Sequence, residues 1–525
     1  MSGGRRQVRP GLELRRCSDA VSIAEQASSH IEVSLIRQVR PRPAALAAAG
    51  FAAATLTVVA GGRVGPVLGS ARLTSWFGLM AGSPARVDGR VLPGALQAFG
   101  IGALVIVWLL TLSAIWAGQW REGVAWRLAA WWAIPFVLGP PLLSSDVYSY
   151  AAQGALVDRG LNPYALGPAA LSNGDVLNAV DPVWRNAPSP YGPLTGLIQH
   201  GAVALGGSPV GAVVALRIVA VLSVVVIGLC AATLATDRMR ATAVALTVLN
   251  PLVLLQVVSA SHLEGAMCAL LMLALVACRR SPALALVAAC AAAAIKAPAA
   301  AAILLISAQH WRMARSWTTR SPNWAYWLQP VAVVAACWLT FSLLVAHSWG
   351  WLSALTTPTV GYTRGSPTAL LGDLLSAIVS WAPSPDTIAA ARAVGLVAAA
   401  CIVCYLAATS DRRQLSRSVG YGLLAVAALG PVIYPWYLLW GLVCLAPTAV
   451  SRFERRLVIT ASGFACFMGL TGLNHTGVVA SEVLLVVAAF VIATRWWGPA
   501  LLRTRLRRPV AEVPDSSFAQ TTVSG

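Results

Sequence analysis

Long apolar segments separated by short, often arginine-containing loops constrain the fold of this chain more than any other feature. They fall at 44–60, 94–117, 124–143, 209–236, 240–258, 264–278, 282–295, 297–308, 328–346, 388–408, 418–432, 436–450, 457–472 and 478–495. A spanning helix needs about 20 apolar residues. Only 11% of the 525 residues are charged, whereas soluble domains carry roughly 25%. The sequence predicts an all-α polytopic membrane protein with about 12 to 14 transmembrane helices, in which residues 282–308 form one long helix or a tight hairpin.

The distribution of the basic residues predicts which helix ends face the cytoplasm. With a cytoplasmic N-terminus, the inner segments hold 28 of the 38 Lys and Arg residues and the outer segments hold eight. Such an excess follows the positive-inside rule. We therefore expect basic, disordered cytoplasmic tails at 1–43 and 496–525, around a transmembrane domain at 44–495 in the plasma membrane. Because the basic residues are scattered between apolar segments, the net charge of +19 indicates membrane orientation and not nucleic-acid binding.

Two of the outer loops are long, at about 144–208 and 347–386. Each contains an apolar piece, Leu194–Leu205 in the first and Ala369–Trp381 in the second, that is too short to span a bilayer. We expect short interfacial or re-entrant helices at these places. Long loops without a domain of their own usually carry function, so the active site is expected on the extracytoplasmic side.

Asp146 is the first charged residue after the apolar segment that ends at Leu143. A carboxylate at the membrane boundary is costly unless it has a function, and Tyr148 places an amphipathic ring at the same boundary. A general base needs an ionised carboxylate in a partly desolvated pocket, but the sequence Ser-Ser-Asp is also typical of a helix cap. Both interpretations are open, and Asp146 is the candidate catalytic residue.

His262 and Glu264 lie in a very short outer hairpin, where a turn lets both side chains face the same cavity. Hydrogen bonds to a polyhydroxylated ligand are one interpretation, and a polar turn without a ligand is the other. A metal site has little support, because no second His or carboxylate pair keeps a ligand spacing. We expect no cofactor, and a requirement for a divalent cation stays open.

Lys296 is the one lysine of the chain and stands in a run of alanines, followed by Pro298. Proline disfavours a continuous helix, so we expect Lys296 at the tip of an outer hairpin. It either binds a phosphate as a point charge or extends to the interface without a ligand.

Arg364 lies in the second long loop beside Gly365, where the backbone can approach an anion closely. Tyr191 lies at the outer boundary, where an aromatic belt and sugar stacking are both possible.

Four sequence stretches carry a resemblance to a known family. They are SSDVYSYAAQGALVDRGLNPYALGP (144–168), NAPSPYGPL (186–194), NPLVLLQVVSASHLEG (250–265) and IYPWYLLW (433–440), together with the lone Lys296. The chain resembles the polyprenol-phosphomannose-dependent α-(1→6)-mannopyranosyltransferases, types A and B, from about residue 44 to 495. These enzymes belong to the GT-C class of membrane glycosyltransferases. The resemblance implies a catalytic aspartate in the first large extracytoplasmic loop, which falls on Asp146, although GT-C enzymes often show paired acids where this chain has Ser145–Asp146.

The resemblance implies a mannosyltransferase that uses a polyprenyl-phosphate-mannose donor and an α-1,6-mannan acceptor of the lipomannan or lipoarabinomannan type. The residues support a donor of this kind independently, because nucleotide sugars are cytoplasmic and an outward-facing enzyme needs a donor delivered in the bilayer. Two alternatives stay open. One is a GT-C transferase of another sugar, and the other is a transporter or flippase of a lipid-linked sugar. Transporters place ionisable groups near the midplane, whereas the candidate residues here gather at the outer helix ends.

Overall fold

The structure is a computed structural model, and it describes residues 41–64, 91–172, 174–317, 324–344, 350–354, 366–380, 385–409, 411, 414–448, 451–468 and 470. All of them lie in the first of two compact units, Met1–Leu473. The predicted tails at 1–43 and 496–525 lie almost wholly outside the described residues, as do the segment 478–495, Arg364 and most of the loop before α16. The described residues form helices and turns and contain no strand.

The longest helices correspond to the most apolar segments of the sequence. They are α2 (Pro43–Val64), α3 (Val91–Trp116), α8 (Pro209–Leu234), α14 (Trp324–Leu344) and α17 (Pro385–Thr409). Among the described residues, these 5 are long and apolar enough to cross a membrane, and the count is 6 if the pair Asp237–Thr247 and Pro251–Ser259, bent by 41°, is one span. The prediction of an all-α polytopic membrane protein is confirmed, while the total of 12 to 14 spans stays a prediction.

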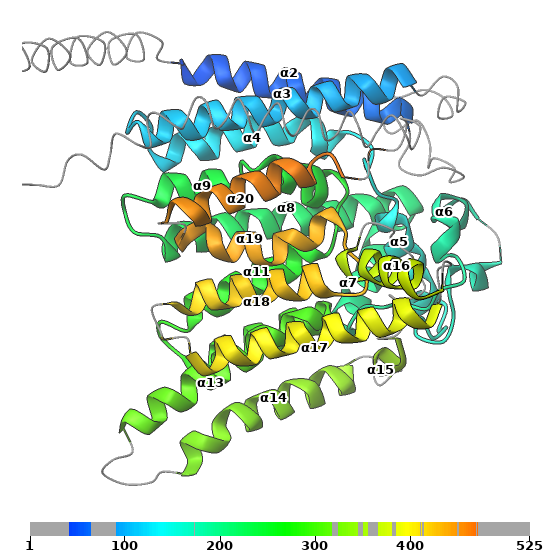
Figure 1. Ribbon diagram of the computed structural model, residues 1–525. Helices are drawn as coiled ribbons and strands as arrows, with labels where there is room; N and C mark the ends of the chain where they lie inside the picture. Colours follow the sequence, from blue (N-terminus) through cyan, green and yellow to red (C-terminus); the bar gives the residue numbers. More distant parts are fainter. Residues whose placement is uncertain are drawn as a thin grey trace, which may run out of the picture. The chain divides into compact units, whose positions relative to one another are not determined.

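Shorter helices complete the bundle, in which the long helices lie side by side (Figure 1). They are α4 (Glu122–Leu138), α9 (Arg240–Thr247), α10 (Pro251–Val253), the π-helix η4 (Leu254–Ser259), α11 (Glu264–Ala277), α12 (Pro282–Ile295), η5 (Ala297–Ala299), α13 (Ala300–Trp317), α18 (Leu415–Leu429), η8 (Pro435–Leu438), α19 (Leu439–Leu445), η9 (Ala446–Thr448) and α20 (Arg452–Ala465).

Residues 282–308 form a hairpin and not one long helix. Lys296 ends α12 with an extended backbone, at φ −149° and ψ 129°, and the short turn η5, which contains Pro298, follows. His310 of α13 lines the same cavity as Pro282, the first residue of α12, so the two helices run in opposite directions. This geometry places Lys296 at the hairpin tip, as the sequence predicted.

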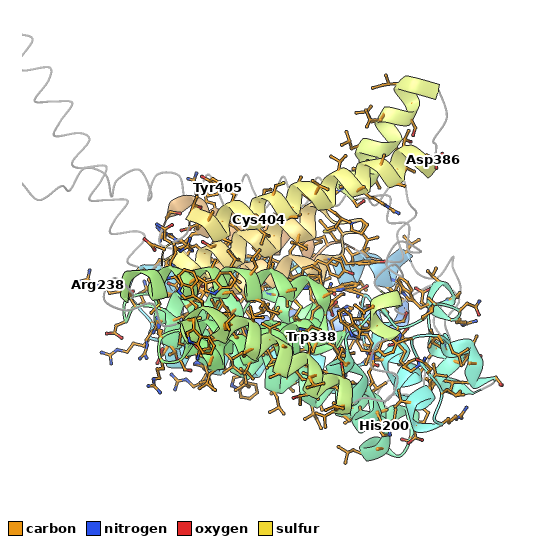
Figure 2. All side chains as sticks on the ribbon, turned by 90° about the horizontal axis from the view of Figure 1, so that it is seen from below. His200, Arg238, Trp338, Asp386, Cys404 and Tyr405 are labelled. Atoms are coloured by element: carbon orange, nitrogen blue, oxygen red, sulfur yellow. The ribbon has the colours of Figure 1, made fainter. Side chains whose placement is uncertain are left out.

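One end of the bundle carries the connecting segments that hold the candidate residues (Figure 1). They contain α5 (Asp146–Asp158), η2 (Pro168–Leu171), α6 (Asp175–Ala179), η3 (Pro182–Trp184), α7 (Pro193–Gly206), α15 (Gly350–Ala354) and α16 (Pro367–Ser380). The two short apolar pieces expected as helices are α7 and α16, so that prediction is confirmed. Figure 2 shows His200 of α7 and Arg238, which follows α8, at opposite ends of the bundle.

The helix before Asp146 ends earlier than its apolar sequence suggested. The apolar segment continues to Leu143, but α4 ends at Leu138 and Gly139 has an extended backbone. Pro140 and Pro141 follow, and because the residue before a proline is disfavoured in the helical region, the helix ends ahead of them. Residues 139–145 are therefore a connection across the end of the bundle, and Asp146 begins a new helix, α5.

Close backbone contacts hold α5 and α7 in place. Gly154 of α5 packs against α7 so tightly that a Cβ there would lie 2.3 Å from the carbonyl oxygen of Gln199. The backbone N–H of Gly192 donates to the carbonyl of Ile295 at 3.0 Å, and the hydroxyl of Thr195 donates to the same carbonyl at 2.9 Å. Since Ile295 precedes Lys296, these bonds attach the start of α7 to the tip that carries the lysine.

Candidate active site

Unusual backbone conformations flank the two segments that carry the candidate acids. Leu143 has a φ of 64° and Ser261 a φ of 58°, and both are in the left-handed region that side chains other than glycine rarely adopt. The segment before Ser261 is the π-helix η4. π-Helices and strained backbone both concentrate at functional sites. The strain thus lies three residues before Asp146 and directly before His262.

Asp146 is the first residue of α5 and its side chain is 18% exposed. Its backbone N–H donates to the Ser144 hydroxyl at 3.1 Å, and Ser145 is the N-cap residue of the helix. Burial and, to a smaller extent, the nearby Glu264 carboxylate raise the pKa of Asp146 to about 7, against the opposing effect of the Lys296 ammonium. A carboxylate that ionises near neutral pH and remains partly accessible has the properties of a general base.

His262 connects the two acids. Its Nδ1 lies 3.6 Å from Oδ2 of Asp146 and 3.9 Å from Oε2 of Glu264. The ring stacks on Trp436 with centroids 3.8 Å apart, and its Nε2 is buried with no hydrogen-bond partner. Burial lowers the pKa of His262 to about 4, so the ring is neutral at pH 7. A neutral imidazole that is fixed by stacking thus lies beside the Asp146 carboxylate without adding a charge to the site.

Glu264 and Lys296 form a buried ion pair. The Nζ of Lys296 donates to Oε1 of Glu264. The side chain of Lys296 is 10% exposed and that of Glu264 is 0% exposed. The same Nζ donates to the Tyr437 hydroxyl at 3.3 Å, and it lies 4.3 Å from the centroid of that ring. It also lies 5.1 Å from the centroid of Tyr191 and 5.6 Å from that of Trp440. Aromatic rings contacted by an ammonium supply favourable cation–π interactions.

Two tyrosine hydroxyls line the space between His262 and Lys296. The Tyr150 hydroxyl is 3.2 Å from that of Tyr191 and 3.4 Å from Nδ1 of His262. The two rings meet edge to face, with centroids 5.3 Å apart. Both residues are more than nine-tenths buried. The site therefore presents carboxylate, imidazole, phenol and ammonium groups within one desolvated cluster, which we call the Asp146 cluster: Asp146, Tyr150, Tyr191, His262, Glu264 and Lys296.

Arg217 of α8 fixes the two segments that carry the acids relative to each other. Its guanidinium donates to the carbonyls of Val137 and Gly139, which precede Asp146. It also donates to the carbonyl of Ser259 at 2.7 Å and to the hydroxyl of Ser261 at 3.2 Å. The residue is only 3% exposed. Arg217 therefore acts inside the protein, where it links the segment that precedes Asp146 to the segment that precedes His262.

Comparisons with known proteins assign the chain to a family. A sequence model described as "Alpha-(1->6)-mannopyranosyltransferase, N-terminal domain" matches residues 47–314, and one described as "MptB C-terminal domain" matches residues 368–497. The chain belongs to the α-(1→6)-mannopyranosyltransferase family. The family identity makes the chain a multi-pass membrane glycosyltransferase and confirms the resemblance found in the sequence.

Relatives with such names align with most of the chain. The chain is 28% identical over 473 residues to α-(1→6)-mannopyranosyltransferase A of Mycobacterium tuberculosis, with 84% of this chain and 86% of the relative aligned. It is 28% identical over 444 residues to α-(1→6)-mannopyranosyltransferase B of Corynebacterium glutamicum, with 76% and 73% aligned. No solved structure matches the chain significantly.

Most of the residues predicted from the sequence of this mannopyranosyltransferase homologue meet in one place. Asp146, His262, Glu264, Lys296 and Tyr191 all belong to the Asp146 cluster. Tyr148 is 2% exposed and interacts electrostatically with Arg217. Arg364 lies outside the described residues. Within the part of the chain that the structure describes, no group of three or more His, Cys, Asp or Glu side chains is placed to hold a metal ion.

Sequence reasoning assigned less to several residues than the structure does. Trp436 and Tyr437 contact His262 and Lys296 directly, although the sequence marked them only as part of the stretch 433–440 that carries the family resemblance. Gln153 was not singled out. Its Oε1 accepts from Ser189 at 3.1 Å and from Gln199 at 2.9 Å, which attaches the Ser-Pro-Tyr-Gly segment to α5. The available signal was its spacing, because Gln153 follows Asp146 by seven residues and so lies on the same face of α5.

Proposed function

We propose that this protein transfers mannose from a polyprenyl-phosphate-mannose donor to an α-1,6-mannan acceptor of the lipomannan or lipoarabinomannan type. The observation that carries the proposal is the Asp146 cluster, in which a partly exposed carboxylate with a raised pKa lies beside a buried cation. The relatives named α-(1→6)-mannopyranosyltransferases support the sugar and the linkage. The proposed class is GT-C.

In the proposed reaction, Asp146 is the general base of an inverting single displacement. The acceptor 6-hydroxyl loses its proton to the Asp146 carboxylate while its oxygen attacks the anomeric carbon of the donor. The bond from that carbon to the phosphate oxygen breaks, and polyprenyl phosphate leaves. Phosphate is already a good leaving group when its charge is balanced, so one positioned carboxylate suffices. A β-linked donor then gives an α-linked product.

Lys296 is the proposed phosphate ligand, together with Arg364. A lysine ammonium has three N–H donors. One contacts Glu264 and one contacts Tyr437, which leaves the third for a phosphate oxygen. Glu264 fixes the ammonium at the site, and His262, Tyr148 and Tyr191 are proposed to contact or position the substrates. The charge of the leaving phosphate would be balanced by Lys296 at the moment of transfer.

The reaction is proposed to take place on the outer face of the plasma membrane, with the N-terminus in the cytoplasm. The excess of basic residues in the predicted inner segments supports this orientation. The segments that carry the cluster lie at the end of the bundle opposite Arg238 (Figure 2). A lipid-linked donor reaches this position by diffusion in the bilayer, and a glycan acceptor reaches it from the aqueous side.

The test is transfer by the purified full-length protein in liposomes, supplied with radiolabelled polyprenyl-phosphate-mannose and a short α-1,6-mannoside. We expect a product one mannose longer that an α-1,6-specific mannosidase degrades. Polyprenyl-phosphate-glucose and polyprenyl-phosphate-arabinose are supplied in parallel. Transfer from one of these donors, with none from the mannose donor, would establish a GT-C transferase of another sugar.

A further inference from the structure

Three aromatic rings are stacked one on another at the edge of the Asp146 cluster. The ring of His262 lies on Trp436 with centroids 3.8 Å apart and an interplanar angle of 22°. The ring of Tyr434 lies on Trp436 at 4.6 Å and 5°. In the part of the chain that the structure describes, no ring contact joins His262 to Tyr434 directly, so the two rings lie on opposite faces of Trp436. This aromatic stack therefore begins beside Asp146 and ends at Tyr434.

Local contacts fix the Tyr434 ring and leave its outer face uncovered by the neighbouring rings. Because a residue before a proline is disfavoured in the helical region, Pro435 keeps Tyr434 extended, at φ −123° and ψ 153°. The Tyr437 ring is 5.3 Å from that of Tyr434 and 6.0 Å from that of Trp436. These two distances place it beside both stacked rings and not over the outer face of Tyr434. The hydroxyl of Thr368 in α16 holds the same segment by donating to the carbonyl of Gly430 at 2.9 Å.

Each ring of the aromatic stack has a polar atom without a partner. Trp436 is 6% exposed and its Nε1 has no hydrogen-bond partner, and the same holds for Nε2 of the buried His262. Tyr434 is partly exposed, and its hydroxyl bonds to none of the described residues. Since nearly all buried polar atoms in proteins are paired, aromatic packing alone does not explain this arrangement. A ligand with an apolar face and several hydroxyls matches it.

Tyr434 lies on the side of the Asp146 cluster that holds the carboxylate. The stack starts at His262, whose Nδ1 is 3.6 Å from Oδ2 of Asp146. Burial raises the pKa of Tyr434, and among the charged groups the Asp146 carboxylate has the largest effect on it, whereas for Tyr191 that group is Lys296. In an inverting displacement the base acts on the face of the sugar opposite the leaving group. A sugar bound on Tyr434 is therefore on the side of the acceptor.

We propose that the outer face of Tyr434 is the acceptor subsite, on which the terminal mannose of the acceptor packs so that its 6-hydroxyl meets Asp146. The assignment rests on the proposed function, which supplies the acceptor and the base. The C–H groups on one face of a pyranose are attracted to the negative face of an aromatic ring, and a sugar hydroxyl pairs with that of Tyr434. Tyr434 binds and positions the acceptor and takes no proton in the reaction.

The test measures KM for acceptor and donor separately, with the full-length protein in liposomes, polyprenyl-phosphate-mannose and an α-1,6-mannobioside. Tyr434→Leu and Tyr434→Met each remove the aromatic face. Both should raise KM for the acceptor at least about tenfold and leave KM for the donor unchanged. Tyr434→Phe keeps the ring and loses one hydrogen bond, so its acceptor KM should rise only about two- to fivefold. Tyr405 of α17 is 67% exposed and lies toward the end of the bundle that carries Arg238 (Figure 2), so Tyr405→Leu should match the wild type.

A second probe separates acceptor binding from proton transfer. An α-1,6-mannobioside with a 6-deoxy terminal mannose has no hydroxyl to react, but it keeps the face that packs on Tyr434. It should inhibit the wild type in competition with the acceptor. Its inhibition constant should rise in Tyr434→Leu by the same factor as the acceptor KM.

Two results would overturn the proposal. A rise confined to the donor KM would place the donor sugar on Tyr434, and unchanged KM values in both Tyr434→Leu and Tyr434→Met would show that the ring only packs. A loss of acceptor affinity in Tyr434→Phe as large as in Tyr434→Leu would also contradict stacking on the ring. A wild-type protein that transfers no mannose to the mannobioside would instead overturn the proposed function, which is a separate outcome.

Discussion

Replacing Glu264 by Gln should move the pH dependence of mannose transfer toward lower pH, because the Glu264 carboxylate raises the pKa of the proposed base, Asp146. Asp146 and Glu264 approach the same nitrogen of His262 at 3.6 Å and 3.9 Å, so their oxygens are no more than about 7.5 Å apart. Two unit charges at that distance interact by about 2 kcal/mol at an effective dielectric constant of about 20. That energy corresponds to more than one pKa unit, at about 1.36 kcal/mol per unit.

The sign of the shift follows from the charges. A base works in its ionised form, so the rate falls as the pH decreases through the pKa of Asp146, which is about 7. The Glu264 carboxylate raises that pKa and the Lys296 ammonium lowers it. Glu264→Gln removes the first influence and leaves the second. The acid limb of kcat/KM should therefore move at least about one unit toward lower pH.

The assay is the initial rate of mannose transfer in liposomes between about pH 5 and 9, because kcat/KM reports the pKa of the free enzyme. The double variant Glu264→Gln/Lys296→Met is the matched control. It removes both charges, whose effects on Asp146 are opposite, and its acid limb should return close to the wild-type position. An active Glu264→Gln variant with an unchanged acid limb would refute the view that the limb reports Asp146.

Three further predictions concern the parts that hold the site together. Lys296→Met leaves the Glu264 carboxylate buried and unpaired, and thermal unfolding in nanodiscs should show a loss of about 3–5 kcal/mol that the added change Glu264→Gln largely restores; equal stability of the single and double variants would argue against the ion pair. Gly154→Ala places a Cβ 2.3 Å from a carbonyl oxygen of α7 and should cost about 1–3 kcal/mol, whereas Gly201→Ala, which meets nothing within 4 Å, should not destabilise. Arg217→Met leaves buried carbonyls unsatisfied at about 1–3 kcal/mol each, and a variant with wild-type stability would show that the link through Arg217 is dispensable.

The sequence contains enough information for the fold class and for most of the site. Hydropathy predicts the long helices, because only an internally hydrogen-bonded helix of sufficient length is stable in hydrocarbon. Asp146, Lys296 and Glu264 stand out because charges are rare and costly in such a chain. Their meeting in space was also predictable in part, since each one follows or precedes an apolar segment at the same predicted side of the membrane.

The pairing of these residues was not predictable. Nothing in the sequence indicates that Lys296 pairs with Glu264, which lies 32 residues earlier, because that contact depends on how α11, α12 and α19 pack. The end of α4 was placed five residues too late, since apolar residues continue beyond the helix into a connection that Gly139, Pro140 and Pro141 keep extended. The role of Arg217 was not predictable either, because the sequence does not show that its partners are buried backbone carbonyls.

The central claim is that Asp146 removes the proton from the acceptor, and Asp146→Asn tests it most directly. The amide keeps the size of the side chain but cannot take a proton, and loss of a positioned general base costs on the order of 10²–10⁴-fold in rate. We expect the variant to reach wild-type abundance in the membrane and wild-type thermal stability within about 1 kcal/mol, with mannose transfer reduced by at least about a hundredfold. An Asp146→Asn protein that is equally abundant and transfers at close to the wild-type rate would contradict the account.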